Sequence, residues 1–248
     1  MGLTIKSNSK EIYELKKGAK LDVVHLAVDD AAFNGRIALI SDVHSEFYPL
    51  ITELVLYERP DVLFICGDLV HGGRGCDNWD LSIEQITKIA KKIPVVISLG
   101  NHEYEEGDLV DFYEAFNIPN VTILKNSSVK IKDFYIYGYI KKIADCHFAP
   151  SNLLEDRKST ILMCHNPMHY INNPALKGFG FTVSGHCHGG QCRLFNLGLY
   201  APGQGYFPRY TSGFHFDNTL YITRGVGNPN NRVRINNNRE IVFINFEQ

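Results

Sequence analysis

The sequence contains five short segments in which residues that can bind metal ions follow directly after an apolar run. Asp42 and His44 follow residues 37–40, Asp68 follows 62–66, Asn101 and His102 follow 95–99, His165 follows 161–164, and His186 and His188 follow 181–184. Carboxylate, amide and imidazole groups suit borderline to hard divalent ions such as Mn²⁺, Fe²⁺ or Zn²⁺. The pattern therefore indicates metal chemistry that needs no thiolate ligand.

The spacing of these residues is compatible with a pair of ions. Asp42 and His44 are two residues apart, as are His186 and His188, so at the end of a strand each pair can point to the same side. Asp68 ends a neighbouring run, where its two carboxylate oxygens can bridge two ions. Two ions about 3.5–4 Å apart can hold the attacking and leaving oxygens of an in-line displacement at phosphorus, and they lower the pKa of a bound water.

The elements that must position these residues follow from the apolar pattern. The runs are continuous rather than alternating, which is typical of strands covered on both faces. Three segments between and after the first runs (residues 50–57, 81–92 and 109–116) have apolar residues at helical spacing. Alternation of strand and helix predicts an α/β fold with parallel strands, whose carboxyl ends gather the metal-type residues at one edge.

The second half of the chain has a different sequence pattern, which predicts strands without helices between them. Residues 121–124, 129–131 and 134–137 predict a meander of strands, and further strands are expected at 220–223 and 241–244. We find no internal repeat, flexible linker or second core. We therefore expect a single domain over residues 1–248, in which residues 1–34 form an N-terminal strand-rich extension.

Composition excludes several classes of protein. The 248 residues include 25 Lys and Arg against 27 Asp and Glu, and a net charge of −2 argues against a main role in gripping nucleic acid. The longest apolar runs are too short to span a bilayer, and the N-terminus lacks the apolar region of a secretory signal. These features predict a soluble cytoplasmic protein without a transmembrane segment, although peripheral membrane contact stays open.

The six cysteines show no C-x-x-C pair, and three of them lie in or beside apolar runs. This pattern favours reduced, buried thiols over a disulfide framework. A structural zinc site built from Cys187, Cys192 and neighbouring histidines is a weaker alternative, because adjacent residues of a strand point to opposite faces.

Taken in order, the motifs D-x-H, G-D, G-N-H-E, H and G-H-x-H resemble those of the calcineurin-like metallophosphoesterases. The resemblance extends from about Leu21 to the C-terminus. Residues 33–37, 185–191 and 221–227 are similar to a bacterial single-domain branch of that superfamily, which includes phosphodiesterases and UDP-diacylglucosamine pyrophosphatases. The order of five motifs, each closing an apolar run, is much more specific than any one motif alone.

The resemblance implies a four-layer α/β/β/α sandwich with a dinuclear metal site at the carboxyl ends of the strands. It also implies the ligands: one ion on Asp42, His44, Asp68 and His188, and the other on Asp68, Asn101, His165 and His186. The shared ligand is Asp68. His102 matches the family histidine that protonates the leaving oxygen or stabilises the transition state, and Glu103 is expected to orient it.

Several other residues have two readings each. Arg209, Arg224 and Arg234 can contact the substrate or form ordinary solvated or ion-paired arginines, and the aromatic loop at 200–216 can line a leaving-group site or cover a sheet edge. The histidines outside the motifs, which are His25, His71, His147, His169 and His215, are expected to be surface or core residues. Among them His71, three residues after Asp68, is the best candidate for a place in the site.

The function predicted from these features is metal-dependent hydrolysis of a phosphodiester or pyrophosphate bond in a small substrate. Two divalent ions are expected as cofactors, with Mn²⁺ or iron as the first choice and Zn²⁺ as a further one. The alternatives are a UDP-diacylglucosamine pyrophosphatase at the membrane surface, a nuclease that uses the same site, and a metal-stabilised scaffold without turnover.

Overall fold

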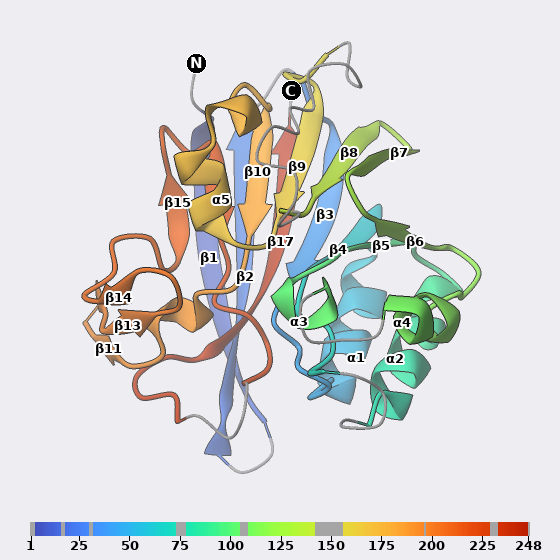
Figure 1. Cartoon of the computed structure of the whole chain (residues 1–248), viewed down its shortest axis with the longest axis horizontal. Helices are drawn as coiled ribbons and strands as arrows, with labels where there is room; N and C mark the ends of the chain where they lie inside the picture. The colour runs from blue at the N-terminus through green and yellow to red at the C-terminus, as the bar shows by residue number, and fades with distance from the viewer. Residues whose placement is uncertain are drawn as a thin grey trace.

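A computed structural model describes residues 3–15, 18–29, 32–72, 78–104, 109–141, 156–195, 197–228 and 233–247. Within these residues, two large sheets form the centre of the molecule (Figure 1). The first sheet has the strand order β1-β2-β17-β3-β4-β5-β6, with β1 (Thr4–Glu14), β2 (Lys20–Asp29), β17 (Arg239–Glu247), β3 (Gly35–Ile40), β4 (Val62–Cys66), β5 (Val95–Ser98) and β6 (Val121–Leu124). The second has the order β15-β16-β10-β9-β8-β7, with β15 (Gly213–His215), β16 (Leu220–Ile222), β10 (Phe181–Ser184), β9 (Thr160–Cys164), β8 (Phe134–Tyr139) and β7 (Ser127–Ile131).

Helices cover the outer faces of both sheets. Helices α1 (Pro49–Glu58) and α2 (Asp80–Ala90) pack through Ile51, Ile86 and Ile89 on a core that includes Leu63 and Ile65 of β4. The short α5 (Pro167–Asn172) lies on the other side, in a core with residues of β9 and β16. Figure 1 shows α1 and α2 beside β4 and β5, and α5 in front of β10. Two further short helices follow β5, namely α3 (Asn101–Tyr104) and α4 (Leu109–Ala115).

A third core lies between the two sheets and completes the layers. Its buried side chains include Phe64 of β4 and Val96 of β5 from one sheet, and Met163 of β9 and Val183 of β10 from the other. Because both faces of these strands are covered, their apolar runs are continuous rather than alternating. The mixed α/β class predicted from the sequence is confirmed, with two sheets face to face between helices.

Parallel pairing brings the strand ends together. Strands β3, β4 and β5 are parallel neighbours, so the residues that follow them emerge at one edge of the first sheet. Strands β9 and β10 are parallel neighbours in the second sheet, and the residues that follow them emerge together as well. The five metal-type motifs occupy these five strand ends.

One expectation about the sheets is wrong. Residues 121–137 do not form a meander, because β6 pairs in parallel with β5 in the first sheet while β7 pairs with β8 in the second. Apolar patterning identifies a strand but not its partner. The turn at Lys125–Asn126 instead carries the chain from one sheet to the other, so that β8 can pair with β9.

The N-terminal segment is an integral part of the first sheet. Strands β1 and β2 form a long antiparallel hairpin, and β2 also pairs along its length with β17 near the C-terminus. None of the helices in the described residues is long and apolar enough to cross a membrane.

The cysteines that are described, Cys66, Cys164, Cys187 and Cys192, are free thiols, and the first three are buried. Cys76, Cys146 and His147 lie outside the described residues.

Candidate metal centre

Five residues of the metal-type motifs adopt a backbone conformation that residues with a Cβ atom seldom take. Their φ angles are positive: Asp42 52°, His44 48°, Asp68 52°, His186 67° and His188 45°. The left-handed region costs about 1–3 kcal/mol for such residues and persists only where the surroundings impose it. Here the positive φ angles turn the chain sharply after each strand, so that the side chains of different loops lie close together.

The first group of donor atoms combines the loop after β3 with the loop after β10. Asp42, His44 and His188 offer ligand atoms that all lie within 4.8 Å of one another. Nε2 of His188 lies 3.3 Å from Oδ1 of Asp42 and 3.3 Å from Nε2 of His44. These separations suit donors arranged about one ion, because each metal–ligand bond is about 2.0–2.2 Å long.

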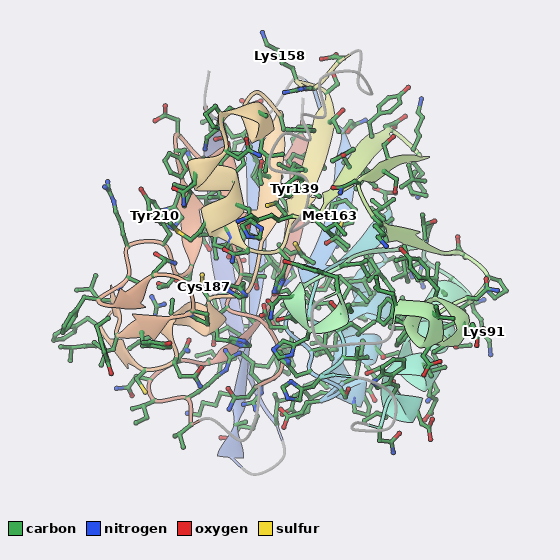
Figure 2. The ribbon with its side chains drawn as sticks, viewed as in Figure 1. Lys91, Tyr139, Lys158, Met163, Cys187 and Tyr210 are labelled. Carbon is green, nitrogen blue, oxygen red and sulfur yellow. The ribbon has the colours of Figure 1, made fainter. Side chains whose placement is uncertain are left out.

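The second group combines the loops after β4, β9 and β10. Asp68, His165 and His186 again have ligand atoms within 4.8 Å of one another. Oδ2 of Asp68 lies 3.0 Å from Nε2 of His165 and 3.9 Å from Nε2 of His44, which belongs to the first group. The Asp68 carboxylate therefore stands between the two groups. Figure 2 labels Cys187, which separates His186 and His188 in the sequence and marks the β10 loop that contributes to both.

The hydrogen bonds of His165 select the tautomer that can bind a metal ion. Its Nδ1 lies 2.7 Å from the carbonyl oxygen of Cys66, an acceptor only, so Nδ1 must carry the proton and donate it. The lone pair of a neutral ring is then on Nε2, which points at Asp68. Asn101 presents a buried Oδ1 that accepts no hydrogen bond within the described part of the chain. A cation between these groups would satisfy all of them.

The electrostatic interactions among these residues also favour a cation bound between them. Burial favours the neutral form of His165, but the charge of Asp68 beside it outweighs burial and raises the pKa of His165 to about 10. Burial likewise opposes ionisation of Asp68, yet His165 holds the pKa of Asp68 well below its usual range. Burial raises the pKa of Asp42 to about 6 and lowers that of His186 to about 3. A pKa of about 10 keeps a proton on His165 at neutral pH, so a divalent ion would have to displace that proton before Nε2 could bind it. The neutral His186 and the ionised Asp68 are already in the donor state that divalent ions need, so the residues fit two such ions.

Glu103 performs a different role from the one expected from the sequence. Its buried carboxylate accepts hydrogen bonds from the backbone N–H groups of Asp68 (3.0 Å), Val70 (3.1 Å) and Gly100 (2.6 Å). It thus joins the loop after β4 to the loop after β5, and it holds the backbone of Asp68 rather than the ring of His102. Burial raises the pKa of Glu103 to about 7.

His102 lies at the edge of the centre. Its backbone N–H donates to Oδ1 of Asp68 (3.0 Å), and its Nε2 lies 4.0 Å from Oδ2 of the same residue. The ring of His71 is 4.5 Å from that of His102, centroid to centroid, and 5.6 Å from that of His44. Ligand atoms of these three histidines lie within 4.8 Å of one another, so the structure brings His71 to the mouth of the centre.

A cavity of about 220 Å³ opens beside the second donor group. Its lining includes the site residues Asn101, His165 and His186, and also Tyr104, Tyr139, Lys141 and His169. Tyr139, labelled in Figure 2, comes from the end of β8 in the second sheet. Sequence reasoning missed the contribution of Tyr139, Lys141 and His169, because none of them belongs to a motif.

Two glycines in the motifs are required by close packing. A Cβ atom on Gly67, whose φ is +79°, would stand 2.5 Å from the ring of His165. A Cβ atom on Gly185 would lie within 2.4 Å of the carboxylate of Asp42. These positions let the ligand side chains pass directly over the backbone.

The two arginines expected from the sequence do not line this cavity. Arg224 pairs with Asp22 at 2.7 Å and with Glu240 at 3.1 Å, and it lines a different cavity together with them. Arg234 is close to the centre but turned into the protein: it donates to the carbonyl oxygens of Arg224 and Gly227, and its Nη2 lies 3.3 Å from Nδ1 of His188. The described residues contain no metal-type cluster that includes a cysteine, so the zinc alternative finds no support.

Residues 35–191 match the model of the calcineurin-like phosphoesterase family, and the chain belongs to that family. The chain is 29% identical over 178 residues to the uncharacterized protein YpbG of Bacillus subtilis, a match that covers 68% of this chain and 66% of that one. It is 25% identical over 251 residues to an uncharacterized metallophosphoesterase of Campylobacter jejuni, covering 98% and 63%. The chain thus spans about two thirds or less of the length of these relatives.

Among solved structures, that of a novel archaeal phosphodiesterase aligns with 77% of this chain and 84% of its own, at 13% sequence identity and a TM-score of 0.42. The family assignment confirms the resemblance drawn from the motifs.

Proposed function

We propose that this protein hydrolyses a phosphodiester or pyrophosphate bond of a small substrate, with two divalent ions at the centre described above. The observation that carries the proposal is the position of Asp68, whose Oδ2 lies between the donor group of His165 and that of His44. One ion would be held by Asp42, His44, Asp68 and His188, and the other by Asp68, Asn101, His165 and His186. When bound, the pair supplies Lewis acidity and lowers the pKa of a water molecule to near neutrality.

The side chains around the ions have separate tasks in this proposal. Attack of water forms a new P–O bond, and the P–O bond to the leaving group breaks, so the departing oxygen needs a proton. His102 reaches the mouth of the centre and is held there by its backbone bond to Asp68, so it is placed to give that proton. Lys141 lines the cavity and offers a charge complementary to phosphate.

The size of the cavity supports a small substrate. Its volume of about 220 Å³ exceeds that of a cavity of about 150 Å³ that accepts benzene, so it has room for one ring-sized group. The walls contributed by Tyr104 and Tyr139 favour a flat or partly apolar group there. The preference for a diester or pyrophosphate rests on the resemblance to the bacterial branch.

The identity of the ions is also part of the proposal. Carboxylate, amide and imidazole donors suit Mn²⁺, Fe²⁺ and Zn²⁺ alike, and availability usually decides among them. We propose Mn²⁺ or iron and a cytoplasmic location.

The test is hydrolysis of a chromogenic diester and monoester by metal-stripped protein resupplied with Mn²⁺, together with metal analysis of each variant. Asp68→Asn should lose about 10³-fold or more in turnover and retain less than the full metal content. His102→Ala should lose about 10²–10⁴-fold with its metal content unchanged. Asp133→Asn, at an exposed turn, is the matched control.

Turnover without metal, or full activity of Asp68→Asn, would contradict the proposal. Absence of turnover by metal-loaded protein on these substrates and on nucleotide-linked pyrophosphates would favour the scaffold alternative. Cleavage of DNA or RNA in preference to small diesters would favour the nuclease.

A further inference from the structure

Two adjacent hairpins near the β10 loop expose large apolar side chains. One hairpin joins β11 (Arg193–Leu194) to β12 (Leu197–Gly198), and the other joins β13 (Tyr200–Ala201) to β14 (Gly205–Tyr206). We call their exposed residues the hairpin surface: Leu194 (57% exposed), Phe195 (89%), Leu197 (68%), Tyr206 (80%) and Phe207 (80%). The backbone N–H of Phe207 donates to the carbonyl oxygen of Leu199, which ties the two hairpins into one surface.

The hairpin surface projects from the body of the molecule. Figure 1 shows β11, β13 and β14 grouped at one side, beyond the edge of the two large sheets. None of its residues lines the cavity at the metal centre. Tyr206 and Phe207, the two members of the aromatic loop at 200–216 in this surface, therefore do not form a wall of that cavity.

The backbone conformation at Phe195 and Phe207 gives no reason for phenylalanine. Phe195 and Phe207 have φ angles of 54° and 52°, in the left-handed region where glycine and asparagine are favoured. Phenylalanine at these positions adds a conformational cost and exposes a full aromatic ring to water. A contact outside the chain would account for both residues.

The charge around the hairpin surface indicates the chemistry of the partner. Residues 186–239 contain six arginines and one acidic residue, Asp217, for a net charge of +5 in a chain whose total is −2. Arg232 lies outside the described residues, Arg224 and Arg239 are engaged in ion pairs, and Arg234 donates to backbone carbonyl oxygens. Arg193, which donates to the carbonyl oxygen of Gly189 and to the hydroxyl of Ser212, precedes Leu194, and the exposed Arg209 follows Phe207 by two residues. The hairpin surface thus combines large apolar side chains with two arginines next to them in the chain.

A polar cavity next to Phe195 extends the positive region. It has a volume of about 430 Å³, and its charged lining residues are three cations (Lys10, Arg193 and Arg224) and two carboxylates (Asp22 and Glu240). Both carboxylates already accept hydrogen bonds from Arg224. Lys10 also forms an ion pair with Asp22 at 3.3 Å. The charged residues of the lining therefore leave a net charge of +1, in a cavity that Phe195 also lines.

We infer that the hairpin surface docks on an anionic lipid bilayer. Phe195, Phe207 and the leucines would enter the boundary between headgroups and acyl chains, Tyr206 would lie at headgroup level, and Arg193 and Arg209 would face lipid phosphates. A protruding tip with aliphatic side chains suits a lipid surface better than a second protein copy, which needs an extended matching face, or a nucleic acid, which would use stacked rings and a longer row of cations. This inference concerns membrane attachment and does not depend on the proposed hydrolysis.

The experiment is flotation of the full chain with vesicles of phosphatidylcholine alone or mixed with phosphatidylglycerol. The wild type should float with the mixed vesicles, and binding should fall at high salt. The double variant Phe195→Ser/Phe207→Ser should bind about tenfold less. Tyr57→Ser is the matched control, because Tyr57 on α1 is 81% exposed and lies outside the hairpin surface. Circular dichroism should show that both variants are folded.

Three results would overturn the inference. The first is failure of the wild type to float with mixed vesicles at low salt. The second is equal binding of the wild type and the folded double variant. The third is a different occupant: self-association of the wild type that the double variant lacks would assign the surface to a second copy, and displacement of the protein from vesicles by a single-stranded oligonucleotide would assign it to nucleic acid.

Discussion

The carboxylate of Glu103 accepts a hydrogen bond from the backbone N–H of Asp68 at 3.0 Å. The same oxygen accepts from Gly100, and the other from Val70. One buried side chain thus fixes the loop that carries the bridging carboxylate relative to the loop that carries Asn101 and His102. The strain of the left-handed Asp68 backbone is held in place by this contact.

We expect Glu103→Gln to weaken both the fold and the metal centre. An amide offers one acceptor oxygen in place of two, so at least one of the three backbone N–H groups loses its partner inside the protein, at a cost of about 1–3 kcal/mol. Thermal and urea unfolding measure the loss of stability, and metal titration measures the affinity. Glu84→Gln, at an exposed i,i+4 pair with Lys88, should change stability by less than about 0.5 kcal/mol. Wild-type stability and metal affinity in Glu103→Gln would show that its contacts are dispensable.

Gly67→Ala tests the close approach of His165 to the backbone. The new Cβ would stand 2.5 Å from the imidazole ring, so the ring must move and the second donor group must open. We expect weaker metal binding and loss of about 2 kcal/mol or more of stability. Gly178→Ala is the matched control, since Gly178 also has a positive φ (+89°) but a Cβ there would meet no atom within 4 Å. It should show only the smaller cost of the backbone conformation, and equal effects of the two variants would remove the steric argument.

His169 should make stability depend on pH. Burial, assisted by Lys141, lowers the pKa of His169 to about 4 from the ordinary value of 6.5. The unfolded chain therefore binds the proton more readily between these values, and the corresponding stability is present above pH 6.5 and lost as the pH falls towards 4. His169→Gln should reduce the fall in unfolding midpoint over this interval. His25→Gln is the control, because His25 does not line the cavity. An unchanged pH profile in His169→Gln would contradict the expectation.

His71 should affect substrate more than metal. Its ring is 4.5 Å from that of His102, at the mouth of the centre rather than within either donor group assigned to the ions. We expect His71→Ala to keep the full metal content and to raise KM for a small diester about tenfold, the equivalent of one hydrogen bond to a charged group. Equilibrium binding of inorganic phosphate gives a second measure. Loss of a metal ion from this variant would make His71 a ligand instead.

The sequence alone was sufficient for the motifs, the class of fold and the family resemblance. Each motif is local: it follows a continuous apolar run that is typical of a strand covered on both faces, as Val62–Cys66 before Asp68 shows. Parallel strands separated by helices place such ends together at one edge, so the gathering of Asp42, Asp68 and Asn101 could be anticipated without coordinates.

Contacts between segments that are far apart in the chain required the tertiary structure. The apolar pattern of 121–137 identifies strands but cannot choose between two sheets, and so β6 and β7 separate. Glu103 could be seen as a member of its motif, but its hydrogen bonds to Asp68 and Val70 depend on the register of β4 against β5. The exposure of Phe195 and Phe207 also required the tertiary structure. Their hydrophobicity alone predicts burial, but no described residue of the folded chain covers them. Local propensity acts over a few residues, whereas packing and exposure are decided by the whole set of strands.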